Sequence, residues 1–152
     1  KLLVERTGAS LGDPGPVDVI TPEGHRAWWA RVAADPSRRV LIFEHDGVPA
    51  GAVTFQDHDP AARTAEWGFF LDLDGLRPRN ALFGAWIGLE QAAIRYALDD
   101  LGLAVLGART LATNRPVLTL HRRNGFVEVP SRHYRTDIDG TPTDVLWLEL
   151  HA

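Results

Sequence analysis

The sequence predicts one α/β (α+β) domain over residues 1–152, built on a mixed sheet. Its length suits a single hydrophobic core. Its composition, with 45% hydrophobic and 24% charged residues, is that of an ordinary globular protein. Segments with the period of strands first follow one another directly and later alternate with segments of helical period, which is the order expected for a mixed sheet.

The first elements are a short strand, a linker and a helix. Residues 2–4 are apolar and predict a strand, and the Gly- and Pro-rich residues 8–16 predict an irregular connection. Thr21-Pro22 is typical of a helix start, because the threonine oxygen accepts a hydrogen bond from the first turn and proline suits the first helical position. Asp35-Pro36 is expected to end this helix.

Three strands and a loop come next. Residues 40–44 and 50–55 flank Asp46-Gly47, a dipeptide typical of tight hairpin turns, so they predict two antiparallel strands. Residues 65–71 predict the third strand. Residues 72–79 are expected to form a loop.

The second half alternates between helix and strand. Apolar residues recur at helical spacing over residues 80–101, which predicts a long helix. A strand is expected over residues 105–112, and a short helix between Asn114, as its N-cap, and Gly125. Residues 126–135 and 143–150 predict the last two strands.

Composition excludes several classes of function. The chain has no cysteine, so disulfides, thiolate metal ligands and cysteine nucleophiles are excluded, and we assign no metal site. A net charge of −4 without a dense basic run argues against nucleic acid as a partner. No apolar run reaches the roughly 18 residues of a membrane span, so a cytoplasmic protein is expected by default. Because the chain begins at Lys1 rather than at methionine, we expect a trimmed N-terminus.

The segment from Ala112 to Phe126, ATNRPVLTLHRRNGF, resembles the Asn-x-x-(small)-(aliphatic)-x-Leu-Tyr-x-x-x-Gly-Phe signature of the GNAT N-acetyltransferase family. Residues 71–101 are similar to the family's cofactor loop and helix. Within them Arg79 and Gly84 match the first and last positions of the phosphate loop, Gln/Arg-x-x-Gly-x-Gly/Ala, whereas Leu82 stands where the family has its middle glycine. The resemblance covers about residues 21–150.

The resemblance implies the GNAT fold, in which a mixed sheet flanked by helices is splayed between its fourth and fifth strands, here residues 65–71 and 105–112. It also implies an acyl-CoA-dependent N-acyltransferase that uses acetyl-CoA, or another acyl-CoA, as co-substrate. The primary amine of a small-molecule acceptor would attack the thioester directly.

The acceptor is less well defined by the resemblance. Residues 20–28, 66–69 and 139–145 are similar to bacterial enzymes that acetylate amino-sugars on nucleotide carriers. Acetylation of a protein N-terminus or of an antibiotic is a second interpretation, and a degenerate, non-catalytic binding module is a third. A homodimer is kept as an alternative to a monomer.

The resemblance places the donor site at the start of the long helix. A helix N-terminus presents unpaired N–H groups and a partial positive charge, which suit a pyrophosphate. The simpler interpretations are solvated arginines, a glycine needed for packing and an asparagine that only caps its helix. The residues implied for cofactor binding are Arg77, Arg79, Asn80, Phe83, Gly84 and Asn114.

Two side chains are predicted to move protons. Glu66 matches the position of a common family base, with Asp57 and His58 as rivals. His121 stands where the family has the tyrosine that protonates the leaving thiolate, and an imidazolium can donate a proton near neutral pH. Tyr134 is the second candidate for this acid, and a buried histidine without a catalytic role is the simpler interpretation.

Overall fold

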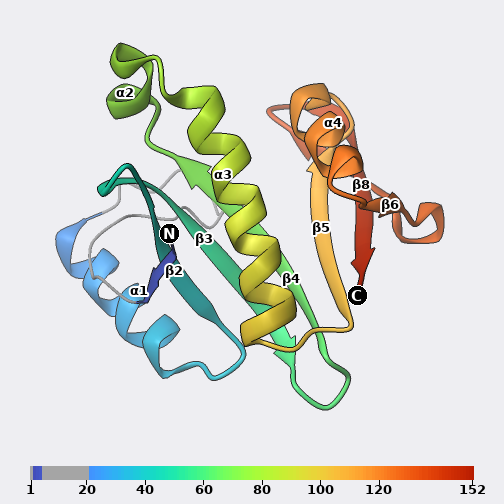
Figure 1. Ribbon diagram of the computed structural model, residues 1–152. Coiled ribbons are helices and arrows are strands. Elements are labelled where there is room, and N and C mark those ends of the chain that lie inside the picture. The colour runs from blue at the N-terminus through green and yellow to red at the C-terminus, as the bar shows by residue number, and fades with distance from the viewer. Residues whose placement is uncertain (1, 5–20) are drawn as a thin grey trace.

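The structure is a computed structural model that describes the backbone of residues 2–4 and the whole of residues 21–152. Its eight strands form one mixed sheet in the order β1-β2-β3-β4-β5-β8-β6, and β7 pairs with β8 (Figure 1). This arrangement confirms the predicted α/β class with a mixed sheet. The predicted connection over residues 8–16 lies outside the described residues.

The strands are β1 (Leu2–Val4), β2 (Arg39–His45), β3 (Val48–Asp59), β4 (Thr64–Leu71), β5 (Val105–Leu111), β6 (Val127–Glu128), β7 (Tyr134–Ile138) and β8 (Thr141–His151). The α-helices are α1 (Pro22–Ala34), α2 (Leu73–Leu76), α3 (Leu82–Arg95) and α4 (Arg115–Arg123). None of the helices in residues 21–152 is both long and apolar enough to cross a membrane.

The predicted start of the first helix and the predicted hairpin turn are confirmed. The Thr21 hydroxyl caps α1 by accepting a hydrogen bond from the amide of Gly24 at 3.1 Å. Between β2 and β3, Asp46 and Gly47 both have a left-handed backbone, with φ of 53° and 76°. Two successive left-handed residues are what a two-residue type I′ hairpin turn requires.

The predicted loop over residues 72–79 is wrong in part. The Asp72 carboxylate accepts a hydrogen bond from the amide of Gly75 at 3.0 Å and so caps the short helix α2, which a 3₁₀ turn at Arg77–Arg79 extends. Asn80 then takes a left-handed backbone, with φ of 50°, so α3 begins at Leu82 rather than at residue 80.

The C-terminal end of the long helix and the strand predicted over residues 126–135 also differ from the prediction. The helix widens into a π-turn at Tyr96–Asp100 and ends one residue before the predicted end. After the two residues of β6, Pro130 opens a 3₁₀ turn through Arg132, and pairing resumes only in β7. Proline has no N–H to donate to a strand ladder, which explains the interruption.

The core lies between the sheet and α3, which crosses one face of the sheet in Figure 1. Every fourth residue of α3 from Ala85 to Ala93 is fully buried, since these positions share one side of the helix. They pack in one cluster with Phe43 and Phe55 of the neighbouring strands. The first half of the sheet is thereby a rigid support for α3.

The strands β4 and β5 lie parallel but pair only over their first halves. Residues Thr64–Trp67 are in register with Val105–Ala108, and the pairing ends there. Beyond this point β4 continues along β3, and β5 continues along β8. Figure 1 shows β4 and β5 diverging toward the N-terminus of α3. The predicted splay between the fourth and fifth strands is confirmed.

Candidate active site

The diverging strands β4 and β5 leave a cavity of about 370 Å³ between them. Because each strand has lost its partner on this side, backbone N–H and C=O groups are left facing the opening, and an amide-containing chain such as pantetheine can pair with them. The cavity is lined by Trp67, Gly68, Phe69, Arg109, Thr110, Leu111, Asn114, Val117 and His121.

The N-terminus of α3 is free to bind an anion. The first hydrogen bond of the helix runs from the Ala85 amide to the Ala81 oxygen at 2.9 Å, so the three amides before it have no intrahelical acceptor. Ala81, at the N-cap, offers no side chain to cap them. The side chain of Leu82 packs against the core, so the residue that replaces the family's glycine does not cover these amides.

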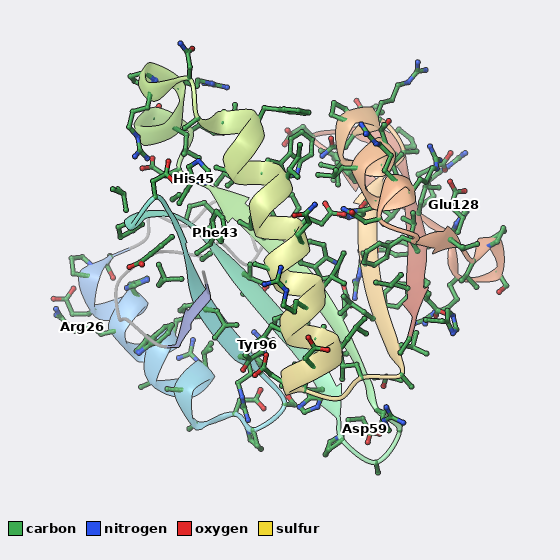
Figure 2. All side chains as sticks on the ribbon, viewed as in Figure 1. Arg26, Phe43, His45, Asp59, Tyr96 and Glu128 are labelled. Atoms are coloured by element: carbon green, nitrogen blue, oxygen red, sulfur yellow. The ribbon has the colours of Figure 1, made fainter. Side chains whose placement is uncertain are left out.

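Neither Gly84 nor Gly88 of α3 is required by packing. A Cβ on Gly88 would lie 3.5 Å from Phe43, so Gly88 lies in ordinary packing contact with the sheet. A Cβ on Gly84 would meet nothing closer than His45, at 3.9 Å. Figure 2 labels Phe43 and His45 beside α3. Packing therefore does not require the glycine at position 84, and its missing side chain leaves the first turn open to a ligand.

The other predicted donor residues lie before α3, in its first turn and at the start of α4. Arg77 and Arg79 are exposed in the turn before α3, and Nε of Arg79 donates to the Gly75 oxygen at 3.0 Å. Phe83 is 65% exposed. Asn114 precedes α4 without making a side-chain capping hydrogen bond and lines the cavity, so its amide remains available to a ligand.

His121 lies in the wall of the cavity, paired with a residue that sequence reasoning missed. Its Nδ1 is 2.9 Å from Oε1 of Glu90 on α3, and the two side chains are only 3% and 0% exposed. The His121 ring also packs against Trp67 and Phe126, with ring centroids 5.5 and 5.0 Å away. Glu90 could have been noticed in the sequence, because it is an acidic residue next to Leu89 in the apolar part of the helix.

Glu66 is paired as well. Nε and Nη2 of Arg109 donate to Oε1 and Oε2 of Glu66 at 2.7 and 2.6 Å, and Nη1 lies 3.4 Å from the Tyr134 hydroxyl. The hydrogen bonds to Glu66 raise the pKa of Arg109 above its usual range. Only 8% of the Glu66 side chain is exposed, so the pair is half-buried. Arg109 was not predicted, although a charged residue inside an apolar strand is a usable signal.

The two predicted catalytic residues line different cavities. Glu66 lines a second cavity of about 320 Å³, which is also lined by Asp57, Trp147 and Glu149. Arg109 lines both cavities. The structure therefore does not bring Glu66 and His121 together in one cavity, and Arg109 is the residue that connects their surroundings.

Of the rival candidates, only Asp57 lines the second cavity. Asp57 is exposed in a bulge of β3 with a left-handed backbone, φ of 52°, and it lines the cavity. His58 has a buried Nε2 without a partner among the described residues. Tyr134, with its hydroxyl near Arg109, is 45% exposed.

Comparison with known proteins identifies the family. Residues 9–127 match the model of the acetyltransferase (GNAT) domain family. A search of the curated proteins found no match. Among solved structures, a spermidine N-acetyltransferase SpeG mutant from Vibrio cholerae is 20% identical with a TM-score of 0.73, covering 85% of this chain and 74% of that chain. Campylobacter jejuni N-acetyltransferase PseH, in complex with acetyl coenzyme A, is 21% identical with a TM-score of 0.66, covering 85% and 78%.

These likenesses agree with the geometry of the site. The match spans most of the chain, and both solved structures share the fold. The parted strands and the uncapped start of α3 fit acetyl-CoA, the co-substrate that GNAT acetyltransferases use. The chain belongs to the GNAT acetyltransferase family and is an acyl-CoA-dependent N-acetyltransferase.

Proposed function

We propose that the protein transfers an acetyl group, or another acyl group, to the primary amine of a small molecule by direct attack of the amine on the thioester. The observation that carries this proposal is the opening between β4 and β5, which widens toward the uncapped N-terminus of α3 and has His121 in its wall. Bound acyl-CoA would supply the activated acyl group.

The donor would be held by the start of α3 and the residues around it. The free amides of residues 82–84 and the exposed guanidinium groups of Arg77 and Arg79 suit a pyrophosphate. Asn80 precedes the helix with a left-handed backbone, and Gly84 leaves space above the first turn. Asn114 would bind the amide-containing arm.

His121 would protonate the leaving thiolate. With Nδ1 engaged by Glu90, Nε2 is the ring nitrogen left to face the cavity that His121 lines. No acyl-enzyme is needed, because the amine itself is the nucleophile. The proton would pass from Nε2 to sulfur as charge develops there.

Glu66 would take up the proton that the amine loses. Both of its oxygens accept hydrogen bonds from Arg109, so the amine, or a water beside it, must compete with the guanidinium. Asp57 is the second candidate, because it is exposed and lines the same cavity.

The second cavity is the proposed entrance for the acceptor. Its volume of about 320 Å³ suits a small molecule. The V. cholerae relative is named for spermidine, and the resemblance of residues 66–69 and 139–145 favours a nucleotide-linked amino-sugar. Three carboxylates line this cavity against two arginines, which favours a positively charged amine.

A screen of amines tests this function. Release of free thiol from acetyl-CoA would be followed with spermidine, a nucleotide-linked amino-sugar, an aminoglycoside and a peptide with a free N-terminus. We expect saturable turnover with one of the small amines and a mass increase of one acetyl group in the product. Calorimetric titration with acetyl-CoA tests the remaining interpretation, which is a non-catalytic binding module. Such a protein would bind acetyl-CoA but would show no turnover with any of the amines.

The predicted homodimer stays a prediction. A structure of the V. cholerae spermidine N-acetyltransferase is described as dodecameric. Light scattering coupled to size exclusion would measure the mass in solution and compare it with multiples of 16.7 kDa.

A further inference from the structure

A buried carboxylate lies behind the proposed proton donor. Glu90 is 0% exposed, and its Oε1 lies 2.9 Å from Nδ1 of His121. Its Oε2 is buried without a hydrogen-bond partner in residues 21–152. Within this part of the chain, the Glu90 carboxylate is therefore paired with His121 alone.

Stability alone does not account for this pair. Two side chains that could be charged have been removed from water, and apolar side chains of similar size often replace such buried pairs without loss of stability. The surroundings of Glu90 on α3 are apolar, with Leu89 and Ala93 fully buried in the core. A leucine at position 90 would fit this environment, so the carboxylate calls for a different explanation.

The contacts of His121 fix which nitrogen faces the cavity. The ring is packed against Trp67 and Phe126, and Nδ1 is held by Glu90. A ring flipped by half a turn would place a C–H group against the carboxylate. With Glu90 ionised, Nδ1–H donates to Oε1, and Nε2 is left for the cavity between β4 and β5.

We infer that Glu90 is a positioning residue for the acyl transfer, one that acts through His121 and rests on the proposed function. Glu90 keeps the proton on Nδ1 and presents Nε2 to the leaving sulfur. In the step itself one proton moves from Nε2 of the imidazolium to sulfur as the carbon–sulfur bond breaks. Glu90 remains a carboxylate, and His121 is left neutral with its proton on Nδ1, to be reprotonated from solvent.

Substitution of Glu90 tests the inference. Glu90→Gln keeps an oxygen for Nδ1–H but removes the charge, whereas Glu90→Leu removes both. With the best amine of the screen, we expect kcat to fall about tenfold in the first variant and about 100-fold in the second. The KM for acetyl-CoA should stay within about threefold of the wild-type value, because Glu90 lies behind His121 and does not itself line the proposed donor cavity.

Three controls separate positioning from packing. Leu89→Ala opens a cavity at the neighbouring buried position, so it should lower the melting temperature but leave kcat near the wild-type value in the folded enzyme. In a His121→Ala background, Glu90→Leu should lower kcat no further, since Glu90 acts only through the missing ring. Nitrogen-15 shifts of the His121 ring should report protonated Nδ1 in the wild type and a mixture of tautomers in Glu90→Leu.

The outcomes can be told apart. A Glu90→Leu enzyme with wild-type kcat and an unchanged His121 tautomer would overturn the positioning role, whatever its melting temperature. A His121→Ala enzyme with normal turnover would overturn both this role and the proposed acid. If the wild type acetylates none of the amines, the proposed function fails, and the tautomer measurement alone decides whether Glu90 orients the ring.

Discussion

Both carboxylate oxygens of Glu66 accept hydrogen bonds from the guanidinium of Arg109, at 2.7 and 2.6 Å. The two residues lie on the neighbouring strands β4 and β5, where these strands begin to part, and Arg109 is two residues beyond Gly107, the register partner of Glu66. Arg109 also lines the cavity that contains His121. The pair thus stands at the junction of the proposed donor and acceptor cavities.

This junction leads to a prediction for Glu66. Glu66→Gln keeps an oxygen for Arg109 but cannot take up a proton, so kcat/KM for the amine should fall by about 100-fold or more. The affinity for acetyl-CoA, measured by calorimetry, should not change, because Glu66 lines the other cavity. Asp57→Asn is the matched control, and we expect it to retain most of its activity. The reverse result would assign the proton transfer to Asp57.

A second prediction concerns Gly107 on β5. A Cβ at this position would lie 2.3 Å from the indole of Trp147, which lies across the strand. Gly107→Ala must therefore displace Trp147 and should lower the free energy of unfolding by about 1–3 kcal/mol in urea denaturation.

Gly88→Ala is the control for this substitution. The added methyl group would make an ordinary contact at 3.5 Å with Phe43, and alanine favours a helix interior over glycine by about 0.5–1 kcal/mol. Gly88→Ala should thus be as stable as the wild type or more stable. An equal loss of stability in both variants would mean that the close approach of Trp147 is not what requires the glycine.

Elements with strong local signals could be predicted from the sequence. Thr21-Pro22 marks the start of α1, and Asp46-Gly47 marks the hairpin turn, because each depends on neighbouring residues only. The sequence analysis did not predict the helical turns within residues 72–79. The helix α2 has only one turn, which is too short for a helical period to be detected. The break at Pro130 was missed although the sequence carries a signal for it, because proline is rarely found inside a strand.

The candidate catalytic residues could be named from the sequence, but their hydrogen-bond partners could not. The resemblance located Glu66 and His121, yet the partners of both came from elsewhere in the chain. Arg109 is 43 residues from Glu66, and Glu90 is 31 residues from His121. Contacts of this kind depend on how β4, β5, α3 and α4 are arranged in space, and no local pattern in a single sequence specifies them.

A third prediction concerns pH and Glu149. Burial raises the pKa of this carboxyl, but hydrogen bonds from Trp147, Arg132 and His151 outweigh burial and lower the pKa below the ordinary 4.5 of a glutamate. A lowered pKa in the folded state means that Glu149 stabilises the fold above pH 4.5 and that this contribution is lost as the pH falls further.

The variant Glu149→Gln measures this contribution. The wild type should exceed it in unfolding free energy by about 1–3 kcal/mol at pH 7, as expected for hydrogen bonds to a charged group. The difference should shrink when denaturation is repeated below pH 4.5. A difference that does not depend on pH would show that the ionised carboxylate is not the stabilising form.

A fourth prediction separates ligand binding from capping at Asn114. Because its side chain makes no capping hydrogen bond, Asn114→Ala should change the unfolding free energy by less than about 0.5 kcal/mol. The same change should raise the Kd for acetyl-CoA if the amide binds the donor. Thr21→Ala is the opposite case, since Thr21 does cap α1, and it should cost about 1 kcal/mol without affecting acetyl-CoA.

The last prediction concerns the phosphate site at the start of α3. Arg79 is exposed, and its Nε donates to the Gly75 oxygen, which holds the guanidinium in the turn that precedes the helix. A charge-assisted hydrogen bond of about 1.5–3 kcal/mol corresponds to a roughly 10- to 150-fold change in affinity. Arg79→Ala should therefore weaken acetyl-CoA binding by this factor in calorimetric titration.

The Arg79→Ala substitution should change the binding of acetyl-CoA but not the turnover. The contact with the pyrophosphate would be the same before and during the reaction, so KM for acetyl-CoA should rise while kcat stays nearly constant. Arg135→Ala is the matched control, because Arg135 is an exposed arginine paired with Asp144 on the strands β7 and β8. Its removal should leave acetyl-CoA affinity unchanged. If Arg79→Ala also binds acetyl-CoA normally, the phosphate site depends on Arg77 and the free amides of α3 rather than on Arg79.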